Sequence, residues 1–387
     1  MVHSWKDPLP PENAVIGPLD HIEFYLVRLP FKAPLGTSVA SWSAREAIIL
    51  RLLQNGIVGW GECSADIDPY YDSETNGTAA HIIQDFLLPE VRAELTLGEV
   101  MTRFRRVRGH CMAKAAVENA LLDLIARREG LPLHQFLGFA NKPILSGITI
   151  GIQDSIEILL KKTEAAVAIG YHRVKVKIMR GKDIEWMRAV REAFPKLPLM
   201  ADANGDYTLE HTELLCQLDE FDLTMVEQPL GYHDIYQHSL LQKKMRTPLC
   251  LDESIHSLDD AAAAIALGSC RIINIKQGRV GGLLESIRMA RLCQASGVPV
   301  WSGGMDETGI GRAFNIHMQT ADNFIIPGDT SETSLYFKED IADPPVKLGA
   351  DGFITIPAGP GTGMTIDPVR LERYTLKRWR YQGQEIK

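Results

Sequence analysis

The sequence predicts an α/β protein, with a closed (β/α) barrel and a smaller α+β domain. The first observation is a series of five charged residues, each ending a short apolar run and each 24 or 25 residues from the next. We call this set the charged ladder: Lys177, Asp202, Glu227, Asp252 and Lys276. Helix-like segments fill the intervals, and repeated strand–helix units build a closed parallel barrel. The second observation is a run of strands followed by helices over residues 18–140, which is typical of an α+β domain.

Composition limits the class of protein. The 387 residues suffice for one large and one smaller domain. A net charge of −8 gives no basis for binding nucleic acid or an anionic membrane. The first twenty residues are rich in proline and lack an apolar core, so we expect no signal peptide. No apolar run approaches the roughly 18 residues of a membrane span, and the six scattered cysteines are expected to be reduced, so we expect a cytoplasmic protein.

The smaller domain is predicted to begin with a strand and a hairpin. Its elements are, in order, a strand at His21–Leu29, a hairpin of Glu46–Leu53 and Ile57–Trp60, and helices at Thr78–Val91 and Met112–Arg128. Asn55-Gly56 supplies the hairpin turn, and Gly130 closes the last helix. Two polar loops, residues 34–38 and 63–71, are placed to cover a site.

The barrel domain is predicted over residues 141–357. Besides the charged ladder, its elements are a strand at Ile148–Ile152, helices at Ser155–Ile169 and Leu258–Leu267, a strand at Val298–Ser302 and a weak eighth strand at Phe324–Pro327. Ser257 begins the second of these helices, and Gly170 and Gly268 close the two. The remaining segment, residues 358–387, is predicted to return to the first domain after a glycine-rich turn, so both chain ends form a lid over the barrel mouth.

The charged ladder predicts a metal site at that mouth. A parallel barrel brings the carboxyl ends of its strands together, and catalytic residues gather there. A single charge at a strand end is more often a solvated loop residue, but five in register indicate function. Asp202, Glu227 and Asp252 are hard oxygen ligands, which favours Mg²⁺, with Mn²⁺ as a substitute. Their open side would take a small-molecule carboxylate substrate, whose enediolate the metal would stabilise once the α-proton leaves.

Lys177 and Lys276 flank the three carboxylates and are predicted to be the catalytic bases. Because they project from opposite sides of the ring, one can remove a proton from one face of the enediolate and the other can return it to the opposite face. Lys175 shares the inward face of its strand with Lys177. We therefore place Lys175 among the substrate-binding residues, where its like charge would also lower the pKa of Lys177.

Five motifs contain the charged ladder: Lys175-Val176-Lys177, Asp202-Ala203-Asn204, Glu227-Gln228-Pro229, Asp252-Glu253-Ser254 and the run from Lys276 to Gly282. Together they resemble the enolase superfamily, in its muconate-cycloisomerase-like subgroup. Lysine bases, Mg²⁺ and an enediolate are established chemistry of that superfamily. Mandelate-racemase-like members carry a histidine base on the seventh strand, where this chain has Trp301-Ser302-Gly303.

Further motifs are similar to those of the o-succinylbenzoate synthase and N-acylamino acid racemase family. They are Gly59–Cys63, Met112-Ala113-Lys114, Gly303-Gly304-Met305, Gly309–Ala313 and Pro327–Ser331. The resemblance implies a TIM-like (β/α)7β barrel, an N-terminal α+β capping domain completed by the C-terminal segment, Mg²⁺, and a cytoplasmic homo-oligomer. It also implies these substrate-binding positions: Thr149, Lys175, Asn204, Gly303, Gly304, Met305, Asp306, Leu35 and Tyr71.

The loops depart from the family pattern. Thr149 stands where serine is usual, which keeps the hydroxyl, and Leu35 stands where an aromatic residue is common. Asp306 follows the Gly-Gly-Met motif, where an apolar residue is usual, while Asp66 and Asp68 make the second loop acidic. An enclosed carboxylate requires a cation. We therefore expect a substrate with a basic or polar side chain, contacted foremost by Asp306; the alternative is that all three aspartates face water.

Two reactions fit these residues equally: racemisation of N-acyl (N-succinyl) amino acids, and o-succinylbenzoate synthesis by dehydration. Racemisation uses both lysines as acid and base, whereas the synthase reaction uses one of them only as a cation. A dipeptide epimerase is disfavoured, because that group carries Asp-x-Asp on the eighth strand, where this chain has Asp329-Thr330-Ser331. The remaining alternatives are an acid-sugar dehydratase or cycloisomerase of the same superfamily, and a non-catalytic metal-binding protein.

Overall fold

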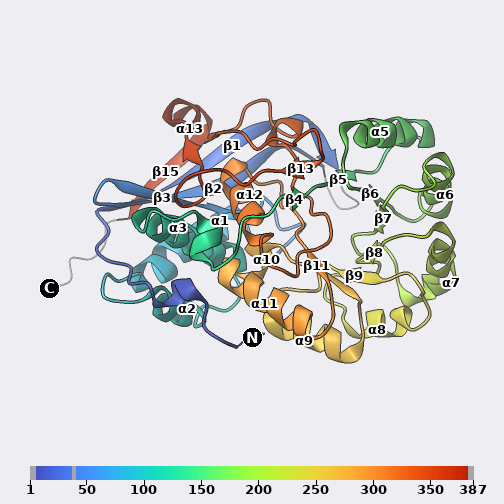
Figure 1. Cartoon of the computed structure of the whole chain (residues 1–387), viewed down its shortest axis with the longest axis horizontal. Coiled ribbons are helices and arrows are strands. Elements are labelled where there is room, and N and C mark those ends of the chain that lie inside the picture. Colours follow the sequence, from blue (N-terminus) through green and yellow to red (C-terminus); the bar gives the residue numbers. More distant parts are fainter. Residues whose placement is uncertain (1–5, 37–40, 382–387) are drawn as a thin grey trace.

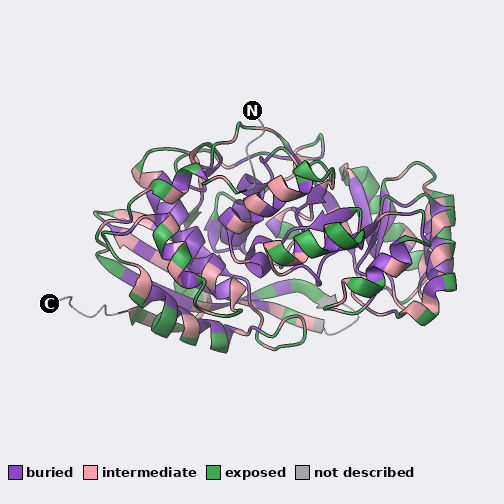
Figure 2. Ribbon diagram, turned by 90° about the horizontal axis from the view of Figure 1, so that it is seen from below, coloured by how far each residue is buried: buried purple, intermediate pink, exposed green. Residues whose placement is uncertain are grey.

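The computed structural model describes residues 6–36 and 41–381. It contains an antiparallel sheet covered by helices and a curled parallel sheet surrounded by helices, which lie side by side (Figure 1). The predicted fold class, a barrel with an α+β capping domain, is confirmed. Buried residues face the interior of both parts, and exposed residues follow the outer faces of the surrounding helices (Figure 2). No helix within the described ranges is long and apolar enough to cross a membrane.

The capping sheet has the strand order β15-β1-β2-β3. Its strands are β1 (His21–Gly36), β2 (Ser41–Gln54), β3 (Ile57–Cys63) and β15 (Thr375–Tyr381). The hairpin between β2 and β3 turns at Asn55 and Gly56, with φ of 49° and 80°, as the Asn-Gly signal predicts. The C-terminal strand β15 pairs antiparallel with β1, so the two ends of the chain complete one sheet.

Two glycines of β3 let a buried helix lie directly on the capping sheet. The helices of this part are α1 (Asn76–Ile82), α2 (Leu97–Phe104), α3 (Cys111–Arg128) and α4 (Leu133–Phe136). A Cβ atom on Gly59 would lie 2.5 Å from the Ala120 carbonyl oxygen of α3, and one on Gly61 would lie 2.2 Å from that of Ala116. Any larger residue would push α3 off the sheet. The predicted helix at residues 78–91 is irregular. The α-helix α1 ends at Ile82, and a short π-helix followed by a 3-10 turn continues the chain to Glu90.

The barrel sheet contains seven parallel strands in the order β11-β10-β9-β8-β7-β6-β5. They are β5 (Gly147–Ile150), β6 (Arg173–Lys177), β7 (Leu199–Asp202), β8 (Val226–Glu227), β9 (Leu249–Leu251), β10 (Ile272–Asn274) and β11 (Val300–Trp301). The helices between and after them are α5 (Ile156–Ile169), α6 (Ile184–Ala193), α7 (Thr212–Cys216), α8 (Tyr236–Gln242), α9 (Leu258–Leu267), α10 (Gln277–Val280), α11 (Leu283–Ala295) and α12 (Gly309–Met318). Helices α5 to α9 form the outer edge of the barrel at the right and bottom of Figure 1.

Local signals place the barrel helices as predicted. The Ser155 hydroxyl accepts a hydrogen bond from the Ile158 amide at 3.3 Å and begins α5, which ends at Gly170 with φ of 99°. Ser257 caps α9 in the same way, and Gly268 closes it with φ of 67°. Caps of this kind satisfy backbone groups that a helix leaves unpaired at its ends.

The weak eighth strand closes the barrel without forming a regular ladder. The Val300 amide donates to the Asn323 carbonyl at 3.3 Å, which ties the segment to β11. On the other edge, the Gly147 amide of β5 donates to the Gly328 carbonyl at 2.7 Å. Residues 323–328 therefore bond to both edges of the seven-stranded sheet.

The last part of the described chain returns to the capping sheet. Short strands β12 (Ala342–Asp343) and β14 (Thr365–Ile366) pair with each other, and β13 (Phe353–Ile354) pairs with β4 (Ile144–Leu145). Helix α13 (Pro368–Tyr374) then leads into β15. The glycine-rich turn lies against α3, because the Thr362 amide donates to Asp123 Oδ1 at 2.7 Å. The domain boundaries at residues 140 and 357 stay predictions.

Buried glutamates of the capping domain bond to the first turns of barrel helices. Glu62 on β3 accepts hydrogen bonds from the Thr308 amide at 3.0 Å and the Gly311 amide at 2.8 Å, at the start of α12. Glu118 on α3 accepts one from the Leu284 amide of α11 at 3.0 Å. Helix N-termini attract negative charge, but burial dominates here and raises the pKa of Glu62 to about 7 and that of Glu118 to about 8.

A buried carboxylate also ties the C-terminal strand to the capping sheet. Glu23 on β1 lies directly opposite Arg51 of β2 and Arg380 of β15. It accepts hydrogen bonds from Arg380 at 2.9 Å, Arg378 at 2.8 Å and Tyr25 at 2.8 Å. Burial opposes the charge, but these hydrogen bonds outweigh it and lower the pKa of Glu23 from 4.5 to about 2.

We predict that Glu23→Gln lowers the free energy of unfolding by about 1–3 kcal/mol at pH 7, because it leaves the arginine donors without their charged acceptor. A depressed folded-state pKa stabilises the protein above the unfolded-state value and stops doing so as the pH falls through the folded-state value. The difference between wild type and variant should therefore shrink from pH 4.5 towards pH 2. Denaturant unfolding at pH 7 and in steps between pH 4.5 and pH 2 measures it.

Glu46→Gln on β2 is the matched control, because the Glu46 carboxylate makes one contact of 3.7 Å with a half-exposed arginine. Its effect should stay below about 1 kcal/mol. An equal loss of stability in the two variants would contradict the role assigned to Glu23.

Candidate active site

The charged ladder meets at the carboxyl ends of the barrel strands. Lys177, Asp202 and Glu227 are the last residues of β6, β7 and β8, and they lie side by side in the strand register. Asp252 follows β9 directly, and Lys276 lies two residues beyond β10. The three carboxylates are fully buried. The structure thus brings together all five residues that the sequence singled out for metal binding and proton transfer.

Each carboxylate of the ladder is paired with a cation. Lys177 Nζ lies 2.6 Å from Asp202 Oδ2. Lys175 Nζ lies 3.2 Å from the same oxygen and 3.1 Å from Glu227 Oε2. On the far side of the ring, Lys276 Nζ lies 2.9 Å from Asp252 Oδ2. A lysine therefore contacts every carboxylate of the ladder.

Two asparagines and a further glutamate also contact the residues of the charged ladder or one another. Asn274 of β10 donates to Glu227 Oε1 at 2.7 Å. Asn204 accepts from Lys177 at 2.5 Å and donates to Glu253 Oε1 at 2.7 Å. The second oxygen of Glu253 is buried and has no hydrogen-bond partner within the described residues.

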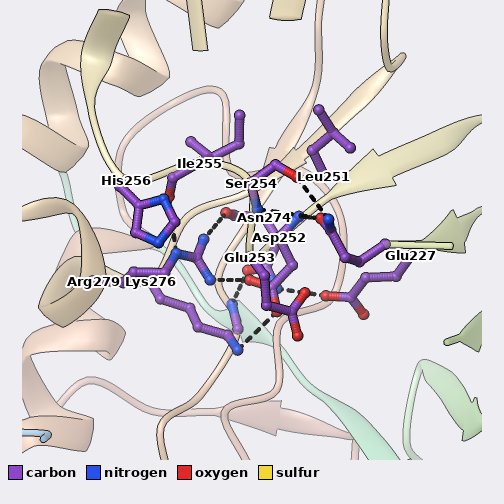
Figure 3. A network of polar contacts seen from close by, with 12 residues as sticks. Glu227, Leu251, Asp252, Glu253, Ser254, Ile255, His256, Asn274, Lys276 and Arg279 are labelled. Carbon is purple, nitrogen blue, oxygen red and sulfur yellow. Dashed lines mark hydrogen bonds and ion pairs between the residues drawn. The ribbon is translucent and has the colours of Figure 1, made fainter. Parts of the chain in front are cut away.

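Arg279 is a site residue that the sequence analysis did not single out. It lies on the one-turn helix α10, directly after Lys276, and it is fully buried. Its Nη1 contacts Asp252 Oδ1, and its Nη2 donates to the Asn274 carbonyl at 3.0 Å. Figure 3 shows Arg279 and Lys276 approaching the Asp252 carboxylate from the same side, with Glu227 across from them. The motif after Lys276 contains this arginine, but only the fold shows that it reaches Asp252.

A second ion-paired group lies beneath Lys175 inside the barrel. Arg173 donates to Asp329 Oδ1 at 2.6 Å, and Lys175 Nζ lies 2.7 Å from the other oxygen of Asp329. Both cations lie over the Trp301 ring, at 4.8 and 5.0 Å from its centre. The tryptophan that replaces a seventh-strand histidine thus supports two buried cations.

Burial and like charges shift the pKa values of the ring in opposite directions. Burial, and then the neighbouring Asp202 carboxylate, raise the pKa of Glu227 well above its ordinary value. Burial also disfavours the ionised form of Asp252, but Arg279 and Lys276 outweigh it and lower the Asp252 pKa. For Lys175, burial is outweighed by Asp329, Glu227 and Asp202, which raise its pKa well above its ordinary value.

The donor set fits a hard divalent cation, although lysines engage its oxygens. Among the residues that the structure describes, no three acidic, histidine or cysteine side chains surround a common metal position. The ion pairs of Lys175, Lys177 and Lys276 explain why the carboxylates do not converge on one position, because each ammonium group is bonded to a carboxylate oxygen. Oxygen-only ligand sets suit Mg²⁺, and a divalent cation would offset both the burial and the repulsion from Asp202 that raise the Glu227 pKa.

A cavity of about 540 Å³ opens at the barrel mouth, bounded by the barrel strand ends, α5, and β1, β2 and a loop of the capping domain. Seven of the predicted substrate-binding residues line it: Thr149, Lys175, Asn204, Gly304, Met305, Asp306 and Tyr71. Lys177 and Lys276 line it as well. Gly303 does not; its amide donates to Asn274 Oδ1 at 2.7 Å, and a Cβ there would lie 2.7 Å from Lys276 Cε. The backbone of Leu35 belongs to β1, and its side chain lies outside the described part of the chain.

Two cavity hydroxyls differ in their contacts. Tyr71 of the capping-domain loop accepts a hydrogen bond from Lys276 Nζ at 2.7 Å, and its ring lies 4.9 Å from the same atom. Thr149 lies beside Lys175 in the strand register, and its buried hydroxyl has no hydrogen-bond partner among the described residues. Tyr71 therefore holds Lys276, whereas the Thr149 hydroxyl remains available to a ligand.

The three loop aspartates have different environments. Asp66 contacts Nη1 of the buried Arg45, and Asp68 accepts a hydrogen bond from Trp42 Nε1 at 3.1 Å. The chain therefore supplies a cation for Asp66 and a neutral donor for one oxygen of Asp68. The other oxygen of Asp68 is buried without a partner among the described residues, but Asp68 is not among the residues that line the cavity. Asp306 accepts no hydrogen bond and forms no ion pair with the residues described, and it lies on the cavity wall.

Comparison with known proteins places this site in a family. Residues 21–138 match the mandelate racemase / muconate lactonizing enzyme N-terminal domain, and residues 159–370 match the enolase C-terminal domain-like family. An o-succinylbenzoate synthase from Geobacillus kaustophilus is 47% identical, over 92% of this chain and 96% of its own. An N-succinylamino acid racemase from Amycolatopsis is 41% identical, over 93% and 98%. A crystal structure of an enolase superfamily member from Listeria innocua superposes with a TM-score of 0.91 at 40% identity, over 94% of this chain and 98% of its own.

The two matching domains together span most of the chain, and the similar enzymes are aligned over nearly their full length. The chain is therefore an enzyme of the enolase superfamily and belongs to its mandelate racemase / muconate lactonizing enzyme family, with o-succinylbenzoate synthases and N-succinylamino acid racemases among its relatives.

Proposed function

We propose that this enzyme removes the proton α to a substrate carboxylate, and that it racemises N-succinylamino acids, forms o-succinylbenzoate by dehydration, or does both. The observation that carries the proposal is the order of the strand ends. Lys177 follows β6 and Lys276 follows β10, and the carboxylates of β7, β8 and β9 lie between them. Both lysines line the same cavity. A planar enediolate between them would present one face to each amine.

We propose Mg²⁺ as the cofactor, with Mn²⁺ as the alternative ion. Asp202, Glu227 and Asp252 would hold it, because they are buried carboxylates at adjacent strand ends and such oxygen donors suit these ions. When bound, the ion supplies a Lewis acid that offsets the negative charge developed on the substrate carboxylate. The buried set of oxygen donors supports this assignment.

The residues of the chain divide the remaining work. Lys177 and Lys276 exchange the α-proton on opposite faces. Lys175 supplies a positive charge beside the substrate carboxylate, and Thr149 and Asn204 offer neutral hydrogen-bonding groups on the cavity wall. Five acidic side chains and five cationic side chains lie together at this mouth. The acids are Asp202, Glu227, Asp252, Glu253 and Asp329, and the cations are Lys175, Lys177, Lys276, Arg279 and Arg173. A bound divalent cation would add positive charge to this mouth, and a substrate with two carboxylates, as N-succinylamino acids have, would offset it.

The relatives include both activities, and the site is compatible with both. A dipeptide epimerase is the less favoured alternative, because the one eighth-strand aspartate at its expected place, Asp329, is bonded to Arg173 and Lys175. We also propose, from the family, a cytoplasmic homo-oligomer.

The first prediction concerns the metal. Excess EDTA should abolish turnover of N-succinyl amino acids, and added Mg²⁺ or Mn²⁺ should restore it. Glu227→Gln should weaken Mg²⁺ binding by about tenfold or more in calorimetry, because it removes one charged ligand. Glu185→Gln, at an exposed position of α6, is the control and should bind Mg²⁺ normally. Full activity in excess chelator would contradict the proposal.

The second prediction concerns the two bases. Lys177→Ala and Lys276→Ala should each reduce racemisation by about 10²-fold or more, because inversion needs an acid on one face and a base on the other. Each variant should still exchange the α-proton of one enantiomer in deuterated water, through the lysine that remains. Polarimetry and NMR measure the two processes, with exposed Lys161→Ala as control. Wild-type racemisation by Lys276→Ala would refute the assignment, and absence of exchange in the wild-type enzyme would favour a non-catalytic protein.

The third prediction separates the two reactions through Tyr71. Tyr71→Phe keeps the ring near Lys276 and removes the oxygen that accepts its 2.7 Å hydrogen bond. Because racemisation needs Lys276 aligned for proton transfer, it should fall about tenfold. We assign Lys276 as the lysine that dehydration uses only as a cation, so the kcat of dehydration should change less than about threefold. The kcat values of both reactions decide the matter, with exposed Tyr70→Phe as control; an equal loss in both would contradict this role of Tyr71.

A further inference from the structure

One carboxylate on the wall of the active-site cavity has no hydrogen-bond or ion-pair partner in the part of the chain that the structure describes. Asp306 accepts no hydrogen bond and makes no ion pair within the described ranges 6–36 and 41–381. It is only partly exposed, and its φ of 54° lies in the left-handed region, which is uncommon outside glycine. A partly buried carboxylate without a partner is costly, so this position calls for a cation or a hydrogen-bond donor.

The neighbouring acids are all bonded by the chain itself. Asp66 contacts Arg45. Glu307 accepts from the Met305 amide at 2.9 Å and from Asn315 Nδ2 at 2.9 Å. Among the acids that face one another here, Asp306 is thus the exception within the described part of the chain.

The arginines of this wall are already bonded elsewhere. Asp66 and Asp306 line the cavity together with the guanidinium groups of Arg45 and Arg312. Arg45 contacts Asp66 and donates to the Ala65 carbonyl at 3.2 Å, and Arg312 donates to the Ser331 carbonyl at 3.0 Å. Neither arginine forms a hydrogen bond or an ion pair with Asp306 in the described ranges, so a cation of the substrate could pair with this carboxylate.

Asp306 also lies within reach of the reaction centre. It is three residues beyond Gly303, which packs against the Lys276 side chain. Three residues span at most about 11 Å of backbone. A substrate whose α-carbon lies at Lys276 can therefore present the end of a long, extended side chain to Asp306.

We propose that Asp306 makes this enzyme selective for N-succinyl amino acids with a cationic side chain, such as the guanidinium of arginine or the ammonium of lysine. The inference rests on the proposed function and specifies its substrate. A guanidinium group can form two parallel hydrogen bonds to one carboxylate, which gives both energy and orientation. An apolar side chain at the same place would leave the carboxylate desolvated and unpaired.

The test compares N-succinyl-arginine with N-succinyl-norleucine, which has a long side chain without charge. In the wild-type enzyme, kcat/KM for N-succinyl-arginine should exceed kcat/KM for N-succinyl-norleucine by at least about tenfold. Asp306→Asn, which keeps the shape and removes the charge, should lower this ratio by about 10- to 100-fold. The kcat/KM of norleucine should stay the same or rise. Asp154→Asn, an exposed aspartate in the loop after β5, is the control and should leave the ratio unchanged.

Calorimetric binding of N-succinyl-arginine gives a second readout that does not require turnover. Weaker binding to Asp306→Asn but not to Asp154→Asn supports the proposal even if racemisation is absent, in which case the proposed function alone fails. Turnover of both substrates with a wild-type preference for norleucine overturns the selectivity and leaves the proposed function intact. If Asp306→Asn does not fold, Asp306→Ser and the wild-type ratio carry the same decision.

Discussion

The balance of charge at the barrel mouth is the constraint on which the rest of this structure depends. Asp202, Glu227 and Asp252 are fully buried, and a buried carboxylate is stable only beside a cation and hydrogen-bond donors. Lys175 and Lys177 meet this requirement on one side, and Lys276 and Arg279 meet it on the other. Lys177 and Lys276 are also the proposed bases, so groups that stabilise the folded site would also perform the chemistry. Parallel strands make this possible because they end at one edge and place successive side chains within contact distance.

The capping domain controls this mouth through a few specific contacts. Glu62 and Glu118 bond to the first turns of α12 and α11, which fixes the capping sheet and α3 against the barrel. The loop that follows β3 of the capping sheet places the Tyr71 hydroxyl in hydrogen-bond contact with Lys276. Arg45 and Trp42 hold the same loop through its two aspartates. The contacts that join the domains therefore also place groups from the capping domain at the site.

Chemistry and specificity are carried by different parts of the chain. The strand ends hold the charged ladder, whereas the cavity wall away from the lysines is formed by loops, α5, α12 and the capping strands β1 and β2. Trp301 occupies the seventh strand, where it supports Arg173 and Lys175, so the barrel interior beneath the site is itself ion-paired. Loop residues such as Asp306 are free of that network and can differ between relatives without disturbing it.

Much of this was readable in the sequence, because it is encoded by local pattern. The spacing of the ladder fixes which residues end successive strands, and Ser155, Gly170, Ser257 and Gly268 mark helix ends through their own backbone chemistry. What the ladder could not show is which distant side chains meet. Arg45 and Asp66 pair across 21 residues and Arg173 and Asp329 across 156, so only the fold brings them together and leaves Asp306 without a hydrogen bond or ion pair among the residues described. Strand ends follow from periodicity, but the pairing of charges depends on the three-dimensional path of the loops, which no local pattern records.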